Sequence, residues 1–135
     1  MEKELFLSGY CRCMDASRMV EVIVDDGEVT EVSVLTEVAD LNAVMDSVQS
    51  MPWSDANNLF LCGHSFGGLV STYVASQRPD EVKGLMVWEP SYQMREYILS
   101  LYPIGSEIPD EIYTPVHVGR IFIEDMQASD IFEVM

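Results

Sequence analysis

The middle of the chain reads LFLCGHSFGG over residues 59–68. The run at residues 58–62 is apolar without alternation, which is typical of a parallel strand buried on both faces. After the serine and its glycines, apolar residues recur at helical spacing until Arg78 and Pro79 stop the pattern. A second apolar run follows at residues 82–88. This order predicts a βαβ unit, and therefore an α/β fold with a parallel sheet and helices on its faces.

A helix is expected before this unit. From residue 34 to residue 48, apolar residues recur at spacings of 4, 3, 4 and 3, which places them on one helix face. Residues 51–55 end the pattern. We expect three acidic residues to point away from the apolar face: Glu37, Asp40 and Asp46.

The two ends of the chain have weaker patterns. Residues 5–15 predict a strand that ends in a carboxylate, and the β-branched residues within 19–24 predict a second extended segment. Beyond residue 91, we expect helices over 92–102 and 116–135, with a loop over 103–115 between them.

The composition restricts the possible partners. The 135 residues allow one domain, and the hydrophobic fraction of 48% is enough for a core. There are 23 acidic residues against 7 Lys and Arg, so the net charge of −16 argues against nucleic acid and anionic lipid. We interpret the acidity as a solvated surface. The acidic run at residues 25–28 lacks the ligand spacing of a calcium loop.

The sequence favours a cytoplasmic protein without cofactors. No run approaches the roughly 18 apolar residues that cross a bilayer. Residues 1–5 lack the basic and apolar regions of a signal peptide. Three cysteines are an odd number, which favours a reduced compartment. Neither the cysteines nor the two histidines have the paired spacing of a zinc site, so we expect no metal.

Residues 63–67 match the pattern G-x-S-x-G between a predicted strand and a predicted helix. A serine hydroxyl is a poor nucleophile unless it is held exposed, beside a base and near donors for an oxyanion. A sharp turn holds it, and Gly63, Gly67 and Gly68 are expected where side chains would collide with neighbouring elements. The amide of Phe66 would lie at the helix N-terminus, pointing at developing negative charge.

Residues 26–90 resemble the α/β-hydrolase superfamily, and within it the cinnamoyl-esterase-like serine hydrolases. The resemblance covers about half of the chain, and the serine turn is its most specific part. It rests on the stretches 26–28, 36–44, 61–68 and 78–85. Residues 18–24 depart from it, because the family has a glycine-rich loop at that place.

The resemblance implies roles for the residues around the turn. Ser65 would be the nucleophile within an elbow that includes Gly63, His64, Gly67 and Gly68, and the Phe66 amide would be one oxyanion donor. Residues 91–135 would begin a lid over the acyl pocket.

The resemblance also implies an acid and a histidine base that come after the lid. No such stretch is found before residue 135, and few residues precede the first expected strand. We therefore expect a single partial domain, truncated at both ends, with a core over 5–90 and a lid-like segment over 91–135.

Three residues of this chain are candidates for the missing acid and base. His64 adjoins Ser65, but neighbouring side chains at such a turn point apart, which favours packing. His117 follows the serine by 52 residues, the order that a base requires, and is otherwise a lid histidine. Glu89 ends the second strand, where some superfamily members place their acid, and is otherwise a plain strand terminus.

Three functions stay open. The first is a serine esterase that forms an acyl-enzyme on a small-molecule ester, with little activity in this chain. The second is a non-catalytic remnant or self-associating module, because exposed sheet edges or the lid would favour a homo-oligomer. The third is acyl transfer or peptide hydrolysis, which the same superfamily also performs. The sequence indicates no acyl-chain preference.

Overall fold

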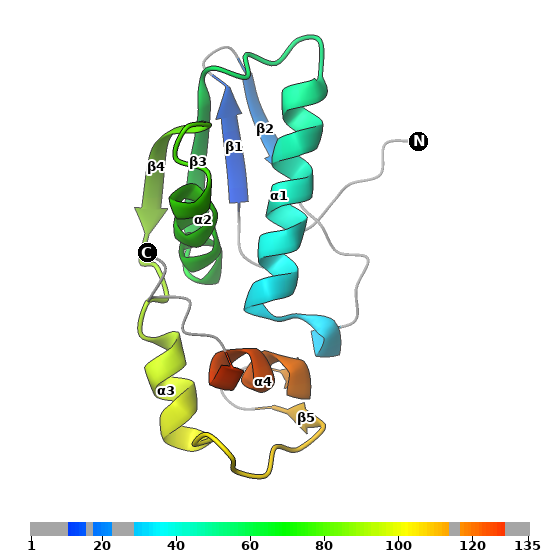
Figure 1. Cartoon of the computed structure of the whole chain (residues 1–135), viewed down its shortest axis with the longest axis vertical. Coiled ribbons are helices and arrows are strands. Elements are labelled where there is room, and N and C mark those ends of the chain that lie inside the picture. The colour runs from blue at the N-terminus through cyan, green and yellow to red at the C-terminus, as the bar shows by residue number, and fades with distance from the viewer. Residues whose placement is uncertain (1–10, 16–17, 23–28, 114–116, 129–135) are drawn as a thin grey trace.

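Four strands form the main sheet, in the order β2-β1-β3-β4. The computed structural model describes residues 11–15, 18–22, 29–113 and 117–128 (Figure 1). The strands are β1 (Cys11–Asp15), β2 (Arg18–Val22), β3 (Leu59–His64) and β4 (Val82–Trp88). The predicted residues 5–10, the end of the segment 19–24 and the acidic run 25–28 lie outside the described residues.

The sheet is mixed. β3 and β4 pair in parallel, joined by helix α2 (Phe66–Gln77), which confirms the βαβ unit. β1 runs antiparallel to both β2 and β3, so the prediction of a parallel sheet holds for the β3–β4 pair alone. The two residues between β1 and β2 explain the antiparallel pairing of these two strands, because a parallel pair needs a long crossover.

Both helices that pack on the sheet lie on the same face of it (Figure 1). They are α2 and α1 (Val34–Ser50). Leu59 and Leu61 of β3 are buried, at 0% and 1% exposed, whereas Phe60 between them is 37% exposed. The prediction that this strand is buried on both faces is therefore wrong, because none of the described helices covers the face that carries Phe60.

Helix α1 follows its predicted boundaries closely. Ser33 caps it, since the Thr36 amide donates to Ser33 Oγ at 3.2 Å and the Ser33 amide donates to Thr36 Oγ1 at 2.8 Å. The predicted apolar stripe is buried throughout: Val34, Val38, Leu41, Met45 and Val48.

Arg78 ties the end of α2 to α1. Its guanidinium donates to Asp46 Oδ1 at 2.6 Å and to Asn42 Oδ1 at 3.0 Å, both on α1, and it also pairs with Glu81. The bond to Glu81, and then the bond to Asp46, raises the pKa of Arg78, and the bond from Arg78 lowers the pKa of Glu81. The residue that stops the helical pattern therefore also fixes how the two helices lie together.

A second layer lies beyond the end of β4 (Figure 1). It consists of α3 (Met94–Leu101), the short strands β5 (Glu111–Ile112) and β6 (Val118–Gly119), and α4 (Arg120–Ala128). Both predicted helices are present, but the two-residue strands fall where a loop and the start of a helix were expected. Residues 129–135 lie outside the described residues.

The second layer has its own buried side chains and is fixed to the first. Ile98, Ile112, Val118, Phe122, Ile123 and Met126 are buried in it. The backbone of Gly119 comes so close to Thr30 that an added Cβ would lie 2.0 Å from the Thr30 carbonyl oxygen. The Leu35 amide also donates to Asp125 Oδ2 at 3.4 Å. The lid-like segment is therefore attached beside the start of α1.

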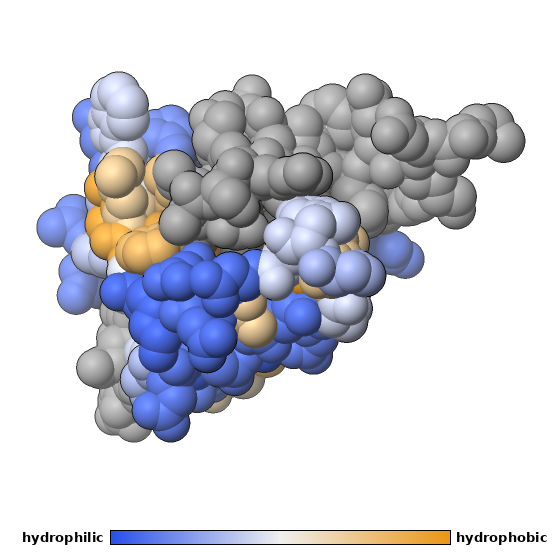
Figure 2. Space-filling view, turned by 90° about the horizontal axis from the view of Figure 1, so that it is seen from above, coloured by the Kyte–Doolittle hydropathy of each residue, from blue (hydrophilic) through white to orange (hydrophobic). Residues whose placement is uncertain are grey.

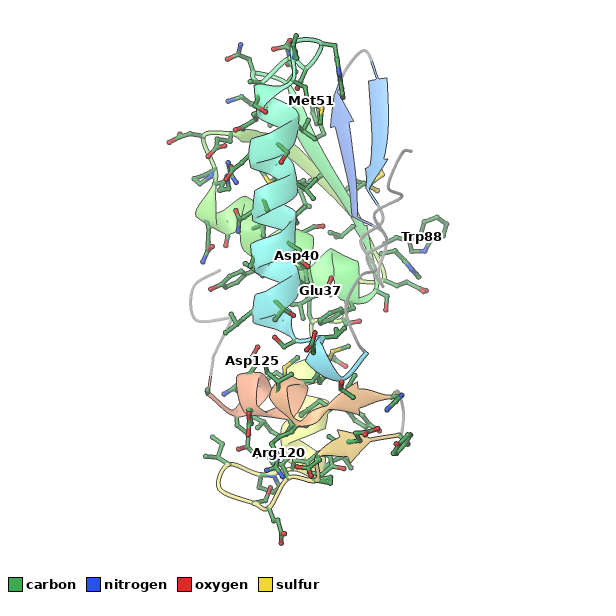
Figure 3. All side chains as sticks on the ribbon, turned by 90° about the vertical axis from the view of Figure 1, so that its right-hand side faces the viewer. Glu37, Asp40, Met51, Trp88, Arg120 and Asp125 are labelled. Atoms are coloured by element: carbon green, nitrogen blue, oxygen red, sulfur yellow. The ribbon has the colours of Figure 1, made fainter. Side chains whose placement is uncertain are left out.

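Glu37 is an exception among the acidic residues of α1. It was expected to point to solvent, as Asp40 and Asp46 do, but it is only 8% exposed. Figure 3 shows it on α1, one turn before Asp40. Burial, with a smaller contribution from Asp40, raises the pKa of Glu37 from 4.5 to about 7.

This carboxyl predicts a pH-dependent stability. Between pH 4.5 and about pH 7, Glu37 keeps its proton in the folded chain but releases it in the unfolded chain. The stability that protonated Glu37 contributes is therefore complete below pH 4.5 and is lost as the pH rises through about 7. Glu37→Gln should therefore raise the free energy of unfolding by about 2 kcal/mol at about pH 8, and change it little below the ordinary pKa.

Urea unfolding at both pH values measures the effect. Glu124→Gln, which alters an exposed carboxylate on α4, is the matched control and should keep the wild-type pH dependence. If Glu37→Gln leaves the pH dependence of stability unchanged, folding does not raise the pKa of Glu37.

Candidate functional site

Ser65 is the single residue between β3 and α2. Its backbone has φ 52° and ψ −120°, a region that non-glycine residues rarely adopt and that costs about 1–3 kcal/mol. Two hydrogen bonds hold it there, one to the end of β4 and one from the segment that follows it. The Ser65 amide donates to the Trp88 carbonyl at 3.0 Å, and the Ser91 amide donates to the Ser65 carbonyl at 3.1 Å. The turn is therefore strained, and the neighbouring strand maintains the strain.

Two glycines make room for this turn. A Cβ on Gly63 would lie 2.3 Å from the Gly67 carbonyl oxygen, a distance that real Cβ atoms do not show. A Cβ on Gly68 would lie 3.0 Å from Pro90 Cβ, which is tight. The structure thus explains physically why glycines surround the serine.

The Ser65 hydroxyl does not cap its own helix. Although Ser65 is the N-cap residue of α2, its side chain makes no capping hydrogen bond. Its Oγ lies 3.2 Å from Ser91 Oγ, within hydrogen-bond distance. The sequence had marked residue 91 only as the start of the lid. Its place just after the strand that follows the helix of the serine turn is the signal that could have identified it.

Phe66 has two roles at the turn. Its amide is the first N–H of α2, and the first N–H groups of a helix have no acceptor within the helix. Its ring packs against Phe122 of α4, with centroids 5.7 Å apart and planes tilted by 50°. The lid-like segment therefore contacts the turn at Ser65 directly, and the amide of Phe66 points to the space beside Ser65 where a helix N-terminus favours negative charge.

His64 and Glu89 lie near each other at the ends of β3 and β4. His64 Nε2 is 4.0 Å from Glu89 Oε2, and the two side chains are 51% and 81% exposed. The His64 ring also meets the ring of Trp88 edge to face, at 6.3 Å. Glu89 has φ 45°, the second strained residue of the region. Neither side chain is hydrogen bonded to Ser65 in the described part of the chain.

His117 lies in the second layer, next to a different carboxylate. Its Nε2 is 2.9 Å from Glu111 Oε2, and its ring stacks on Tyr113 at 4.4 Å. The Tyr113 hydroxyl donates to the same Glu111 oxygen at 2.6 Å. The hydrogen bonds from Tyr113 and then His117 lower the pKa of Glu111, and the bond to Glu111 raises the pKa of Tyr113.

The structure thus groups the candidate residues in two places. Ser65, Phe66 and Ser91 form one group with His64 and Glu89 at its border, and His117 belongs to the other with Glu111. No hydrogen bond between described residues joins Ser65 to a histidine. Within the same ranges, no three His, Cys, Asp or Glu residues are gathered as a metal ion would require. No described helix is long and apolar enough to cross a membrane.

The strain at Ser65 is measurable. Ser65→Gly should raise the free energy of unfolding by about 1 kcal/mol over Ser65→Ala, because glycine adopts a positive φ without steric cost and this outweighs its greater freedom in the unfolded chain. Both variants remove the hydroxyl and its bond to Ser91, so they are matched. Urea unfolding measures the difference. If the Ser65→Ala variant were as stable as Ser65→Gly, or more stable, the turn would not be strained.

Comparison with known proteins identifies the family and the fold of this chain. The family model described as "Serine aminopeptidase, S33" matches residues 26–125. A search of curated proteins finds no match. Among solved structures, the esterase Est1E from Butyrivibrio proteoclasticus, with ferulic acid bound, superposes with a TM-score of 0.69 at 20% sequence identity.

That superposition covers 81% of this chain but 46% of the esterase, so the chain spans about half of its length. At 20% identity, this structural similarity shows that the chain shares the fold of the esterase and nothing more. The family match extends from before α1 into α4 and includes the whole serine turn. The chain belongs to this serine hydrolase family, and so to the α/β-hydrolase superfamily.

Proposed function

We propose that this chain carries the nucleophile and one oxyanion donor of a carboxylic ester hydrolase, with Ser65 forming the acyl-enzyme. The observation that carries the proposal is the conformation of Ser65, strained at φ 52° between β3 and α2. Strain of this kind persists where the surrounding structure imposes it, and it is concentrated at active sites. The fold shared with Est1E, which binds ferulic acid, supports esters of aromatic acids of the cinnamic type as the substrate class.

The Ser65 hydroxyl and the Phe66 amide would each act in a defined step of ester hydrolysis. Ser65 Oγ attacks the ester carbonyl carbon and loses its proton to a base, and the carbonyl oxygen becomes an oxyanion. The Phe66 amide, at the positive end of the α2 dipole, donates a hydrogen bond to that oxyanion. Collapse of the intermediate expels the alcohol, and attack by water on the acyl-enzyme then releases the acid.

The described residues do not place a proton acceptor beside the Ser65 hydroxyl. A serine hydrolase that loses its histidine or carboxylate loses several orders of magnitude in rate. Among the described residues, His117 pairs with Glu111 and Glu89 lies beside His64, so neither reaches the Ser65 hydroxyl by a hydrogen bond. His117 and Glu89 stay candidates for the base and the acid, and we expect little ester turnover from this chain alone.

A second candidate is peptide hydrolysis, as the name of the matching family indicates. An aminopeptidase must bind the cationic amine of its substrate. The exposed carboxylate of Glu89, two residues from Ser91, and the net charge of −16 favour a cation near this site. Turnover of an aminoacyl anilide in preference to an aryl ester would favour this candidate.

Reaction with a fluorophosphonate probe tests the nucleophile without requiring turnover. We expect a single adduct on Ser65, identified by peptide mass spectrometry, and none in Ser65→Ala. Ser91→Ala should slow the labelling about fivefold, the effect of losing one hydrogen bond that orients the hydroxyl. Ser100→Ala, which alters a serine of α3, is the matched control and should label at the wild-type rate. Equal labelling of wild type and Ser65→Ala would favour the non-catalytic alternative.

Hydrolysis of an aryl ester tests the missing base. We expect the wild-type rate to exceed that of Ser65→Ala only slightly. Turnover that depends strongly on Ser65 would contradict this expectation. His117→Ala would then show whether His117 supplies the base. A base acts in its deprotonated form, so its removal should lower the hydrolysis rate mainly at the alkaline end of the pH profile.

A further inference from the structure

Helix α2 begins without the contacts that stabilise most helix N-termini. Its N-cap residue, Ser65, makes no capping hydrogen bond with its side chain, and two glycines of low helix propensity, Gly67 and Gly68, follow in the first turn. The positive φ of Ser65, 52°, adds strain at the same place. A capping bond would engage the same oxygen that attacks as a nucleophile. Other contacts must therefore hold Phe66, the first residue of α2.

The N–H of Phe66, the proposed oxyanion donor, belongs to the peptide unit that joins Ser65 to Phe66. Because this unit is planar and rigid, its N–H has a fixed direction only when both ends of the unit are held. The Ser65 carbonyl is one end, and three backbone amides donate to it. These amides belong to Gly68 at 3.0 Å, Ser91 at 3.1 Å and Leu69 at 3.3 Å. The Cα of Phe66, which carries the ring, is the other end.

A side chain of the second layer holds this other end. The Phe66 ring packs against Phe122 of α4, with centroids 5.7 Å apart, and Phe122 is only 3% exposed. Apolar packing at the start of a helix fixes how the chain enters it, as in the hydrophobic staple. The ring contact therefore replaces the missing side-chain cap without engaging the Ser65 hydroxyl.

Phe122 is itself in a fixed position, because α4 is bonded on two sides. The Arg95 side chain of α3 donates to the Met126 carbonyl at 3.1 Å, and the Leu35 amide of α1 donates to Asp125 Oδ2 at 3.4 Å. A helix of nine residues is too short to be stable alone, so such contacts determine its position. In Figure 1, α4 lies below α1 and α2, at the end of the molecule that carries the serine turn. Figure 2 shows the opposite end, where the surface of the described residues is mostly hydrophilic.

We propose that Phe122 is a positioning residue of the serine site, because its contact with the Phe66 ring fixes the direction of the Phe66 amide. Phe122 touches no reacting atom and acts through Phe66. The inference rests on the proposed function, since this amide matters to the reaction only if it receives the oxyanion formed at Ser65. A segment that the sequence marks as a lid is then a rigid support of the oxyanion site.

The ¹⁵N order parameter of the Phe66 amide tests the ordering directly in the free chain. A value of about 0.85 is typical of rigid backbone, and values below about 0.6 indicate flexible backbone. We expect about 0.85 in the wild type and about 0.6 in Phe122→Ala. Phe122→Leu keeps a large apolar side chain and should keep the wild-type value. Met126→Ala, the matched control, removes a buried side chain one turn further along α4 and should also keep it.

The rate of labelling by a fluorophosphonate tests the consequence for the reaction. Phe122→Ala should slow labelling of Ser65 about tenfold, less than the roughly 10²–10³ that removal of an oxyanion donor costs. Phe122→Leu and Met126→Ala should label at nearly the wild-type rate. Phe66→Ala keeps the amide but removes the ring, so it should also slow labelling about tenfold. The double variant of Phe66→Ala and Phe122→Ala should be no slower than either single variant, because both act through one contact.

Circular dichroism establishes that each variant is folded, and Phe122→Val replaces Phe122→Ala if the latter does not fold. An unchanged order parameter in Phe122→Ala would overturn the proposal. So would an equal effect of Met126→Ala, or labelling about a hundredfold slower in the double variant. If the wild type forms no adduct on Ser65, the proposed function fails, whereas the order parameter still decides whether Phe122 orders the Phe66 amide.

Discussion

The hydrogen bond from the Ser65 amide to the Trp88 carbonyl, 3.0 Å long, is the contact on which the rest of the structure depends. It joins the end of β3 to the end of β4 at the residue where the chain turns into α2. With the bond from Ser91 to the Ser65 carbonyl, it holds a backbone that would relax if it were free. The turn therefore requires β4 in place, and α2 begins where the turn directs it.

This constraint explains the small residues around it. At the close approach of β3 to α2, a Cβ on Gly63 would reach the Gly67 backbone, and Gly68 has little more room beside Pro90. The same geometry leaves the Ser65 hydroxyl and the Phe66 amide at the N-terminus of α2, where the helix dipole favours negative charge. The contact of Phe66 with Phe122 then places the second layer over the turn. Fold and candidate chemistry thus have the same physical origin.

Much of this could be predicted from local patterns in the sequence. The apolar spacing over residues 34–48 identifies α1, and G-x-S-x-G between an apolar strand and a helix identifies the elbow. Local patterns do not show the contact of Ser65 with Ser91, which follows only from the pairing of β3 with β4, because each serine comes shortly after the end of one of these strands. An apolar run also cannot show whether one face or both are covered, which is why the exposure of Phe60 was missed.

Other differences have similar causes. Glu37 was assigned to the solvent side by helical spacing, yet the packing around α1 buries it and raises its pKa to about 7. Strands β5 and β6 have two residues each, too few for any periodicity. His117 had the sequence order of a base, but order along the chain does not specify its partner, which is Glu111.

The central claim is that the backbone at Ser65 forms a preorganised nucleophile and oxyanion site. A crystal structure of the chain after reaction with a fluorophosphonate tests it most directly. The account predicts phosphorus bonded to Ser65 Oγ, a positive φ at Ser65, and the phosphoryl oxygen about 2.7–3.1 Å from the Phe66 nitrogen. A phosphoryl oxygen turned away from the Phe66 amide, or an adduct on another residue, would contradict it.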